Sequence, residues 1–274
     1  MKEYRLETGY SWDKGLSREI NEDSILCTKF DIMTHMGIIS AGLFAVADGM
    51  GGHSSGEIAS DIAIRSLQTA CIPALVARCP TPLPHLSIMA AAFNEANNNI
   101  LNSASEGESR GMGTTLTAAL VIGEDMYVAH IGDSRCYVIN SWDTIQITKD
   151  HSIVQQLVDT GTITAEQARN HPRRNEITRV LGYQGEATPD LHHIKLYAGD
   201  NILLCSDGLH SLLPSNKMVE IVLGSASPAQ ACIDLTDQAN LLGGPDNISV
   251  VIIKPGNLPS WQAVVAAQTS IRKI

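Results

Sequence analysis

The spacing of apolar residues along the chain predicts groups of strands separated by pairs of helices. Two apolar runs, 25–30 and 37–47, are typical of buried strands, and the second ends abruptly at the turn signal Asp48-Gly49. The stretch 126–140 is expected to form one long strand or a bent hairpin arm. Further strands are expected at 114–122, 144–148, 194–197, 202–205 and 248–253.

Helices are predicted by apolar positions that recur at steps of three and four residues. The first begins at Ser54 or Ser55, and the second spans about 86–102, with the Pro-rich stretch 73–84 between them. Shorter helices are expected at 152–159, after the capping box of Thr164, from Ser215, after the cap Ser227 up to Gly243-Gly244, and from Trp261.

The order of these elements favours an α+β layered fold over a parallel, doubly wound sheet. A doubly wound sheet needs a helix after nearly every strand, whereas 114–148 holds three predicted strands with no room for a helix. We therefore expect helices that cover sheets built from consecutive strands.

Composition narrows the classes of function. The chain has 274 residues, 44% of them hydrophobic, which is enough for a sizeable core. With 19 Lys and Arg against 29 Asp and Glu, the net charge of −10 argues against a nucleic-acid partner. The six scattered cysteines indicate free thiols, and no apolar run is long enough for a membrane span. We expect a cytoplasmic protein with no membrane partner.

Acidic residues occur where predicted strands begin or end. One such Asp-Gly pair is most often only a turn, but several converging carboxylates repel one another unless a cation neutralises them. Oxygen ligands without Cys or His favour Mg²⁺ or Mn²⁺. After Asp48, the small Gly49 would let its own carbonyl approach such an ion. The acidic residues are Glu22, Asp23, Asp48, Asp133, Asp207 and Asp246.

Arg18 lies four residues before Glu22 and is open to two interpretations. Its guanidinium is well shaped to grip two phosphate oxygens beside a metal cluster, but it could equally be a surface arginine paired with a carboxylate. The glycines at 51 and 52 lack the Lys and Ser or Thr of a P-loop, so a nucleotide site is not indicated.

Eight short segments together give the chain a specific resemblance. It resembles the metal-dependent protein serine/threonine phosphatases of type 2C, and among these the bacterial, stand-alone members. The segments follow the family's order: Arg18-x-x-Asn21-Glu22-Asp23, Val46-Ala47-Asp48-Gly49-Met50-Gly51-Gly52-His53, Gly111-Met112-Gly113-Thr114-Thr115, Gly132-Asp133-Ser134-Arg135, Asp150-His151-Ser152, Asn170-His171-Pro172-Arg173-Arg174, Ser206-Asp207-Gly208 and Asp246-Asn247-Ile248.

The resemblance implies a four-layer α-β-β-α sandwich of two antiparallel sheets, with a site for two metal ions at one end. It implies that Asp48 bridges both ions, that the Gly49 carbonyl binds one of them, and that Asp207 and Asp246 complete the other. Glu22 and Asp23 would hold metal-bound waters, Arg18 would bind the phosphate, and Asp133 would join Asp207 at a third, weaker metal site.

The expected activity is hydrolysis of phosphoserine and phosphothreonine in proteins by a hydroxide that bridges two Mn²⁺ or Mg²⁺ ions. Animal members of the family carry a His where this chain has Met50, and that His is proposed to protonate the leaving group. Because Met cannot donate a proton, His53 or a water at the Asp133 site is expected to do so.

Residues 1–254 are predicted to form the catalytic domain, with 255–274 as a tail of unknown role. The segment 150–190 resembles the family's flap, in which Arg173 and Arg174 could steer acidic substrates or simply be solvated. Family membership also implies an opposing bacterial Ser/Thr kinase and a monomeric protein. The alternatives are a catalytically inactive module that binds phosphoproteins and, less compatible with the negative charge, a metal-dependent nuclease.

Overall fold

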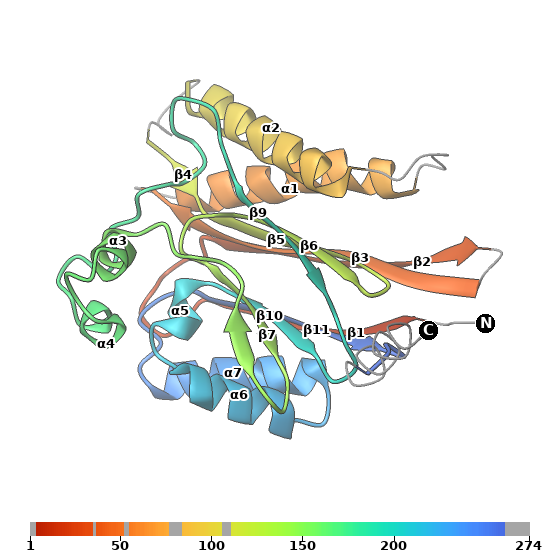
Figure 1. Ribbon diagram of the computed structural model, residues 1–274. Helices are drawn as coiled ribbons and strands as arrows, with labels where there is room; N and C mark the ends of the chain where they lie inside the picture. Colours follow the sequence, from red (N-terminus) through yellow and green to blue (C-terminus); the bar gives the residue numbers. More distant parts are fainter. Residues whose placement is uncertain (1–3, 35–36, 52–54, 77–83, 106–110, 261–274) are drawn as a thin grey trace.

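Two antiparallel sheets lie face to face between two layers of helices in the computed structural model (Figure 1). The structure describes residues 4–34, 37–51, 55–76, 84–105 and 111–260. Every pair of neighbouring strands in the two sheets is antiparallel. The predicted α+β fold, a four-layer α-β-β-α sandwich, is therefore confirmed.

Each sheet is named here by one of its inner strands, β10 or β3. The β10 sheet has the order β1 (Arg5–Asp13), β11 (Ile248–Gly256), β10 (Asn201–Cys205), β7 (Arg135–Ile139) and β8 (Thr144–Gln146). The β3 sheet has the order β2 (Asp23–Thr34), β3 (Gly37–Met50), β5 (Leu116–Ile122), β6 (Asp125–Ile131) and β9 (Asp190–Lys195), and β4 (Gly113–Thr114) pairs with the end of β3.

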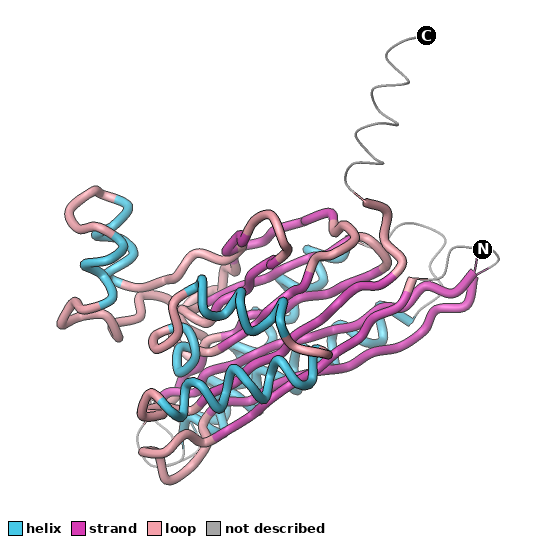
Figure 2. Tube along the Cα trace, turned by 90° about the horizontal axis from the view of Figure 1, so that it is seen from below, coloured by secondary structure: helices cyan, strands magenta, loops and turns pink. Residues whose placement is uncertain are grey.

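Helices cover the outer face of each sheet. On the β3 sheet lie α1 (Ser55–Val76) and α2 (His85–Ser105), and on the β10 sheet lie α5 (Asp207–His210), α6 (Ser215–Gly224) and α7 (Pro228–Leu241). The small helices α3 (Ile153–Asp159) and α4 (Ala165–Arg169) project from one end of the sandwich, as Figure 2 shows. None of the described helices combines the length and hydrophobicity that crossing a bilayer requires.

Three apolar layers hold the sandwich together, and β3 contributes to two of them. Leu43 and Ala45 face α1 and α2, whereas Phe44 and Val46 face the other sheet, because successive side chains of a strand point to opposite faces. A third layer lies between the β10 sheet and its helices. A strand buried on both faces has no polar alternation, which explains the continuous apolar run at 41–47.

The prediction for 126–140 was wrong. This stretch is two strands in different sheets: β6 ends at Ile131 in the β3 sheet, and β7 begins at Arg135 in the β10 sheet. The chain changes sheets at Gly132, which has a φ of 117° and whose added Cβ would lie 2.5 Å from the Thr115 side chain. The crossing therefore requires glycine, and it places Asp133 at the end of the sandwich.

Other elements differ from the prediction in smaller ways. Strand β1 was not predicted, and α1 continues through Pro73 to Val76 rather than ending before it. Helix α5 was also missed. The predicted caps Thr164 and Ser227 are present, because their side chains accept a hydrogen bond from the first turn of α4 and α7. Ser152 caps α3 in the same way.

The described cysteines are free thiols, as expected; they are Cys27, Cys71, Cys136, Cys205 and Cys232. Cys79 and the expected helix from Trp261 lie outside the described residues.

Candidate active site

The candidate active site is a pocket of about 530 Å³ at the end of the sandwich from which α3 and α4 project. Strand ends and their loops supply its polar lining. The predicted site residues that line it are Arg18, Glu22, Asp48, Gly49, Asp133, Asp207 and Asp246, and Met50 lines it too. His53, the expected proton donor, lies outside the described residues.

Asp48 is fixed through its backbone by the loop that follows β4. The Asp48 N–H donates to Thr115 Oγ1 at 2.9 Å, and the Asp48 carbonyl accepts from the Thr115 N–H and from Thr114 Oγ1, each at 2.9 Å. These bonds explain why the Gly-Met-Gly-Thr-Thr segment accompanies the Asp-Gly pair in the sequence. They leave the Asp48 carboxylate as the part that lines the pocket.

Gly49 occupies a place that no other residue fits. An added Cβ would lie 2.1 Å from the Gly56 carbonyl oxygen and 2.5 Å from that of Glu22. Glycine thus lets β3 pass close to both the start of α1 and the β1–β2 loop. This packing by itself requires glycine, and the approach of the Gly49 carbonyl to a cation stays a prediction.

Asp23 lies opposite Asp48 in the β2–β3 register and is buried. The Ser206 hydroxyl donates to Asp23 Oδ2 at 2.8 Å. The pKa of Asp23 is raised to about 7, mainly by burial and also by the charges of Asp207 and Asp246, against the opposing effect of the serine hydrogen bonds. Asp23 does not line the pocket itself, so its place is the layer of polar side chains behind the pocket wall.

The other carboxylates also lie close to like charges, with Asp133 buried and Asp48 and Asp207 partly buried. Burial raises the pKa of Asp207 to about 6, with a further contribution from Asp246. Burial and the charges of Asp23 and Asp207 raise the pKa of Asp48 well above its ordinary value. Burial and the charge of Asp207 do the same to Asp133. Negative charge is thus concentrated where solvent cannot screen it.

These residues fit divalent cations in their chemistry. Asp133 Oδ1 is buried and has no hydrogen-bond partner among the described residues, and such a carboxylate oxygen suits a hard cation. Among the described residues, no three His, Cys, Asp or Glu side chains are arranged as a ready-made metal site. In this structure the Asp246 carboxylate accepts a hydrogen bond from Arg18.

Arg18 stands at the rim of the pocket, about half exposed. Its Nη2 donates to Asp246 Oδ2 at 2.9 Å, and its Nη1 lies 3.8 Å from Glu22 Oε2. The loop that carries Arg18 is held by Asn247, which accepts from the Glu22 N–H at 2.8 Å and donates to the Lys14 and Ile20 carbonyls. Arg18 is therefore both paired with carboxylates and placed where a phosphate could reach it.

His151 connects the flap to the turn that carries Asp133. The His151 N–H donates to the Gly132 carbonyl at 2.7 Å, and the Gly132 N–H donates to His151 Nδ1 at 3.0 Å. Since Nδ1 accepts, Nε2 carries the proton and donates to Asp190 Oδ2 at 3.1 Å.

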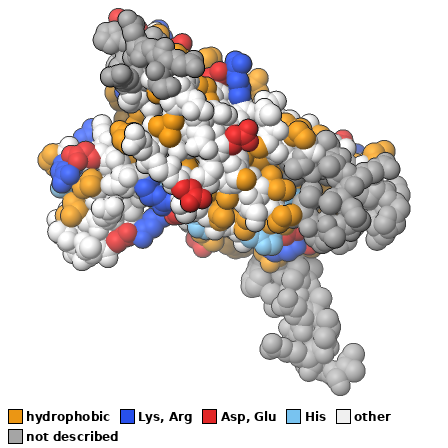
Figure 3. Space-filling model, turned by 90° about the horizontal axis from the view of Figure 1, so that it is seen from above, with side chains coloured by type: hydrophobic (Ala, Val, Ile, Leu, Met, Phe, Trp, Pro, Cys, Tyr) orange, Lys and Arg blue, Asp and Glu red, His pale blue; other side chains and the backbone are white. Residues whose placement is uncertain are grey.

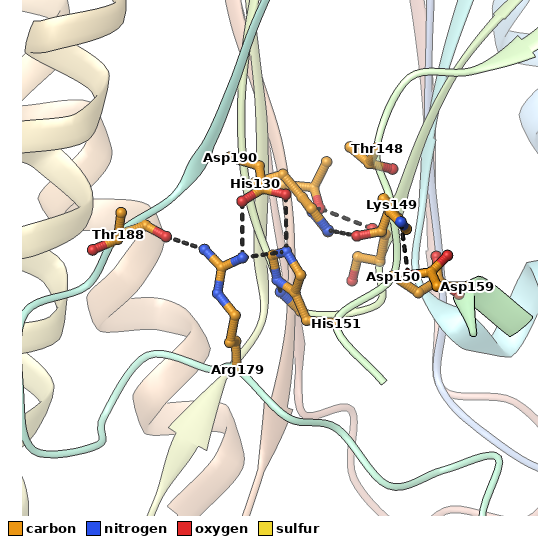
Figure 4. Close-up of polar contacts among 12 residues, drawn as sticks. His130, Thr148, Lys149, Asp150, His151, Asp159, Arg179, Thr188 and Asp190 are labelled. Atoms are coloured by element: carbon orange, nitrogen blue, oxygen red, sulfur yellow. Dashed lines mark hydrogen bonds and ion pairs between the residues drawn. The ribbon is translucent and has the colours of Figure 1, made fainter. Parts of the chain in front are cut away.

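Arg179 completes this connection by donating to Asp190 Oδ1 at 2.8 Å (Figure 4). Its Nη1 also lies 2.7 Å from His151 Nε2, but two N–H donors cannot form a hydrogen bond, so this is only a close contact. Burial lowers the pKa of His151, and the Arg179 charge lowers it further, whereas the Asp190 hydrogen bond raises it. His151 is therefore neutral and keeps one ring orientation.

His210 on α5 was not predicted. It is partly buried, and its Nε2 donates to the Asp133 carbonyl at 3.0 Å. Burial lowers its pKa to about 3, so the ring is neutral. His151 and His210 thus hold the Asp133 turn from two sides. In the sequence, His210 is distinguished only by lying three residues after Asp207. That spacing does not indicate a site residue unless a helix is known to join the two.

Comparison with known proteins agrees with this geometry. The family model for protein phosphatase 2C matches residues 29–238, more than half of the chain. The chain belongs to the protein phosphatase 2C family. It is 35% identical over 243 residues to the serine/threonine phosphatase stp of Listeria monocytogenes. The aligned region covers 88% of this chain and 93% of that protein.

Solved structures of family members share the fold. The serine/threonine phosphatase PstP/Ppp of Mycobacterium tuberculosis superposes with a TM-score of 0.78 at 37% identity, covering 91% of this chain and 98% of that one. The catalytic domain of PstP in complex with two manganese ions gives a TM-score of 0.77 at 35% identity, covering 92% and 99%. The expected family is therefore confirmed, and this chain is a protein phosphatase of type 2C.

Proposed function

We propose that this pocket hydrolyses phosphoserine and phosphothreonine in proteins with the help of two divalent cations, Mn²⁺ or Mg²⁺. The observation that carries the proposal is the group of buried carboxylates with raised pKa values around a pocket that also presents Arg18. The likeness to PstP, whose catalytic domain binds two manganese ions, supports the choice of metal.

The residues divide into those that hold cations and those that handle substrate and water. Asp48, the Gly49 carbonyl, Asp207 and Asp246 would hold the two cations, and Asp133 with Asp207 would hold a third. When bound, the cations lower the pKa of water and neutralise charge on the phosphoryl oxygens. Arg18 binds the phosphate with the N–H donors that it otherwise gives to Asp246. Glu22 and Asp23 orient water.

The proton that the leaving serine or threonine oxygen needs must come from a group other than Met50, which lines the pocket in place of a histidine. His53 and water near Asp133 are the candidates. If His53 is the donor, His53→Gln reduces turnover of a phosphopeptide more than turnover of an aryl phosphate, because the aryl oxide leaves without protonation. Equal losses on both substrates would exclude His53.

A catalytically inactive phosphoprotein-binding module is not supported, because the proposed metal-holding carboxylates are all present and gathered at one pocket. The opposing Ser/Thr kinase, the monomeric state, the cytoplasmic location, the domain limits 1–254 and the role of the 255–274 tail stay predictions. Size-exclusion chromatography with light scattering tests the monomer directly.

The proposal is tested by measuring phosphate release from a phosphothreonine peptide with Mn²⁺ and with chelator. Release that requires Mn²⁺ and is lost in Asp207→Asn supports it. Asp61→Asn on the exposed face of α1 is the matched control, because it removes the same charge far from the pocket lining. A folded wild-type protein that releases no phosphate with any divalent metal would overturn the proposal.

A further inference from the structure

A second pocket of about 260 Å³ adjoins the first on the side of the flap. Asp133, Asn175 and Asp207 line both pockets, so the two pockets adjoin along this edge. The outer wall of the second pocket comes from α3 and α4, and its inner wall includes His210 and Ser211. A chain whose phosphorylated residue enters the first pocket would therefore pass the second one.

The walls of the second pocket combine small apolar side chains with arginines. Val154, Val158, Ala165 and Ala168 give the flap side an apolar surface. Arg135, Arg169 and Arg174 supply guanidinium groups. Several Lys and Arg side chains are also visible at this end of the molecule in Figure 3. The pocket thus offers cationic groups in an otherwise acidic protein.

The arginines of this region differ in whether a carboxylate of the protein already pairs with them. Arg135 is held by Asp150 through two hydrogen bonds of 2.8 and 2.7 Å. Arg173 is held in the same way by Glu176 at 2.8 and 2.7 Å, and it does not line the pocket. Within the described part of the chain, neither Arg169 nor Arg174 has a carboxylate within 4.0 Å.

We propose that the second pocket binds an anionic side chain next to the phosphorylated residue of the substrate, and that Arg169 and Arg174 recognise it. The inference rests on the proposed phosphatase function and adds the class of substrate: phosphoproteins with a carboxylate or a second phosphate near the target residue. Guanidinium groups bind both anions through paired N–H donors. The charge of Arg174, rather than that of Arg173, is the one available to the substrate.

The protein's net negative charge favours local cationic groups where an acidic substrate binds. A net charge of −10 repels an anionic peptide, and this repulsion must be offset locally by cations near the entrance. Asp133 and Asp207 lie between the two pockets and would add to the repulsion until their charge is neutralised. Arg169 and Arg174, on the flap side of the second pocket, are placed to supply the positive charge that reduces this repulsion.

The test compares phosphothreonine peptides that differ at one neighbouring position. Peptides carry Glu, phosphoserine or Gln in turn at each of the nearest positions on both sides, and kcat/KM is measured with Mn²⁺ at low salt. We expect the anionic peptides to exceed the Gln peptide by about three- to tenfold at one or more positions, mainly through KM. The comparison of Glu with phosphoserine shows which anion the pocket prefers.

Variants assign the preference to the second pocket. In Arg169→Gln/Arg174→Gln the ratio of anionic to Gln peptide should fall to about one, and because it is a ratio, a general loss of activity cancels. Arg173→Gln is the matched control and should keep the wild-type ratio. In wild type, about 0.5 M salt should reduce the ratio through screening.

The inference is overturned if wild type shows no preference at any position, or if the preference survives in the double variant. Either result leaves the phosphatase function intact, provided that the Gln peptide is still hydrolysed in a metal-dependent reaction. Loss of turnover of every peptide and of an aryl phosphate would instead contradict the proposed function.

Discussion

Arg18 donates a 2.9 Å hydrogen bond to Asp246, a residue 228 positions further along the chain. The bond joins the β1–β2 loop to the loop before β11 across the rim of the pocket. It raises the pKa of Arg18 further above its ordinary value, although partial burial opposes the shift. The same guanidinium that neutralises Asp246 in this structure is the group that the proposed reaction needs for phosphate.

Replacing Arg18 by Lys tests this double role. Lys keeps the positive charge but loses the planar pair of donors that fits two phosphate oxygens. We expect kcat/KM for a phosphothreonine peptide to fall by about 10- to 100-fold, with KM raised. Arg65→Lys on α1 is the control, because Arg65 also pairs with a carboxylate four residues away but is exposed and remote from the pocket lining. Unchanged kinetics in Arg18→Lys would contradict the assignment.

The stability of the metal-free protein should depend on pH in a direction set by the buried carboxylates. The pKa of Asp23 is about 7 and that of Asp207 about 6 in the folded protein, against an ordinary 3.8. The folded state therefore binds more protons than the unfolded state, and stability falls as pH rises through these values. We expect Asp23 and Asp207 by themselves to contribute about 1 kcal/mol more to the free energy of unfolding in chelator at about pH 6.5 than at about pH 8, and the buried histidines to offset part of this difference.

The histidines limit this gain on the acid side. Burial lowers the pKa of His130 and of His210 to about 3, so below about 6.5 the unfolded state gains protons that these rings cannot take up when folded. Urea unfolding in chelator at a series of pH values should show a maximum near the slightly acidic range. Saturating Mn²⁺ should abolish the fall in the free energy of unfolding at pH values above this maximum. Stability that rises steadily from about pH 6.5 to 8 in chelator would contradict the account.

His151 is expected to influence catalysis through Asp133 rather than directly. It clamps Gly132 with two hydrogen bonds, and Asp133 is the next residue. We expect His151→Ala to lower kcat/KM by about tenfold, and to have little further effect in a protein that already carries Asp133→Asn. The coupling in this double-mutant cycle should be about 1 kcal/mol or more.

A purely structural role for His151 would give losses that add in the cycle. His193→Ala provides the control, since His193 is also bonded to an aspartate, Asp125, but lies at the β6–β9 pair and not on the pocket. His193→Ala should leave kcat/KM unchanged both in wild type and in Asp133→Asn, each compared with its own parent protein. Additive losses for His151 and Asp133 would show that the clamp does not act through Asp133.

The parts of this protein that sequence could predict are those set by local pattern. Asp48 and Asp207 were found because each follows a short apolar run and ends it, and Ser227-Pro228 marked the start of α7. Asp133 was also found, but its strand was not divided correctly. The switch between sheets depends on how Gly132 packs against Thr115, a contact between distant positions that no local pattern records.

Local sequence pattern also could not predict the elements and residues that hold the site loops in place. Strand β1 is an edge strand with mixed polar and aromatic residues, and its place is set by pairing with β11 at the other end of the chain. His210 and Asn247 hold site loops through backbone carbonyls, so neither leaves a distinctive spacing in the sequence. Recognition of the family supplied the arrangement of the carboxylates, which the residues alone left open.

Calorimetric titration of chelator-stripped protein with Mn²⁺ tests most directly whether the buried carboxylates form the working site. The account predicts at least two ions per chain, with protons released on binding at about pH 6.5, because carboxylates with raised pKa values must ionise to become ligands. Titrations in two buffers of different ionisation enthalpy measure that release. Asp48→Asn should lose most of the binding while remaining folded. Absence of binding in wild type, or undiminished binding in Asp48→Asn, would contradict the account.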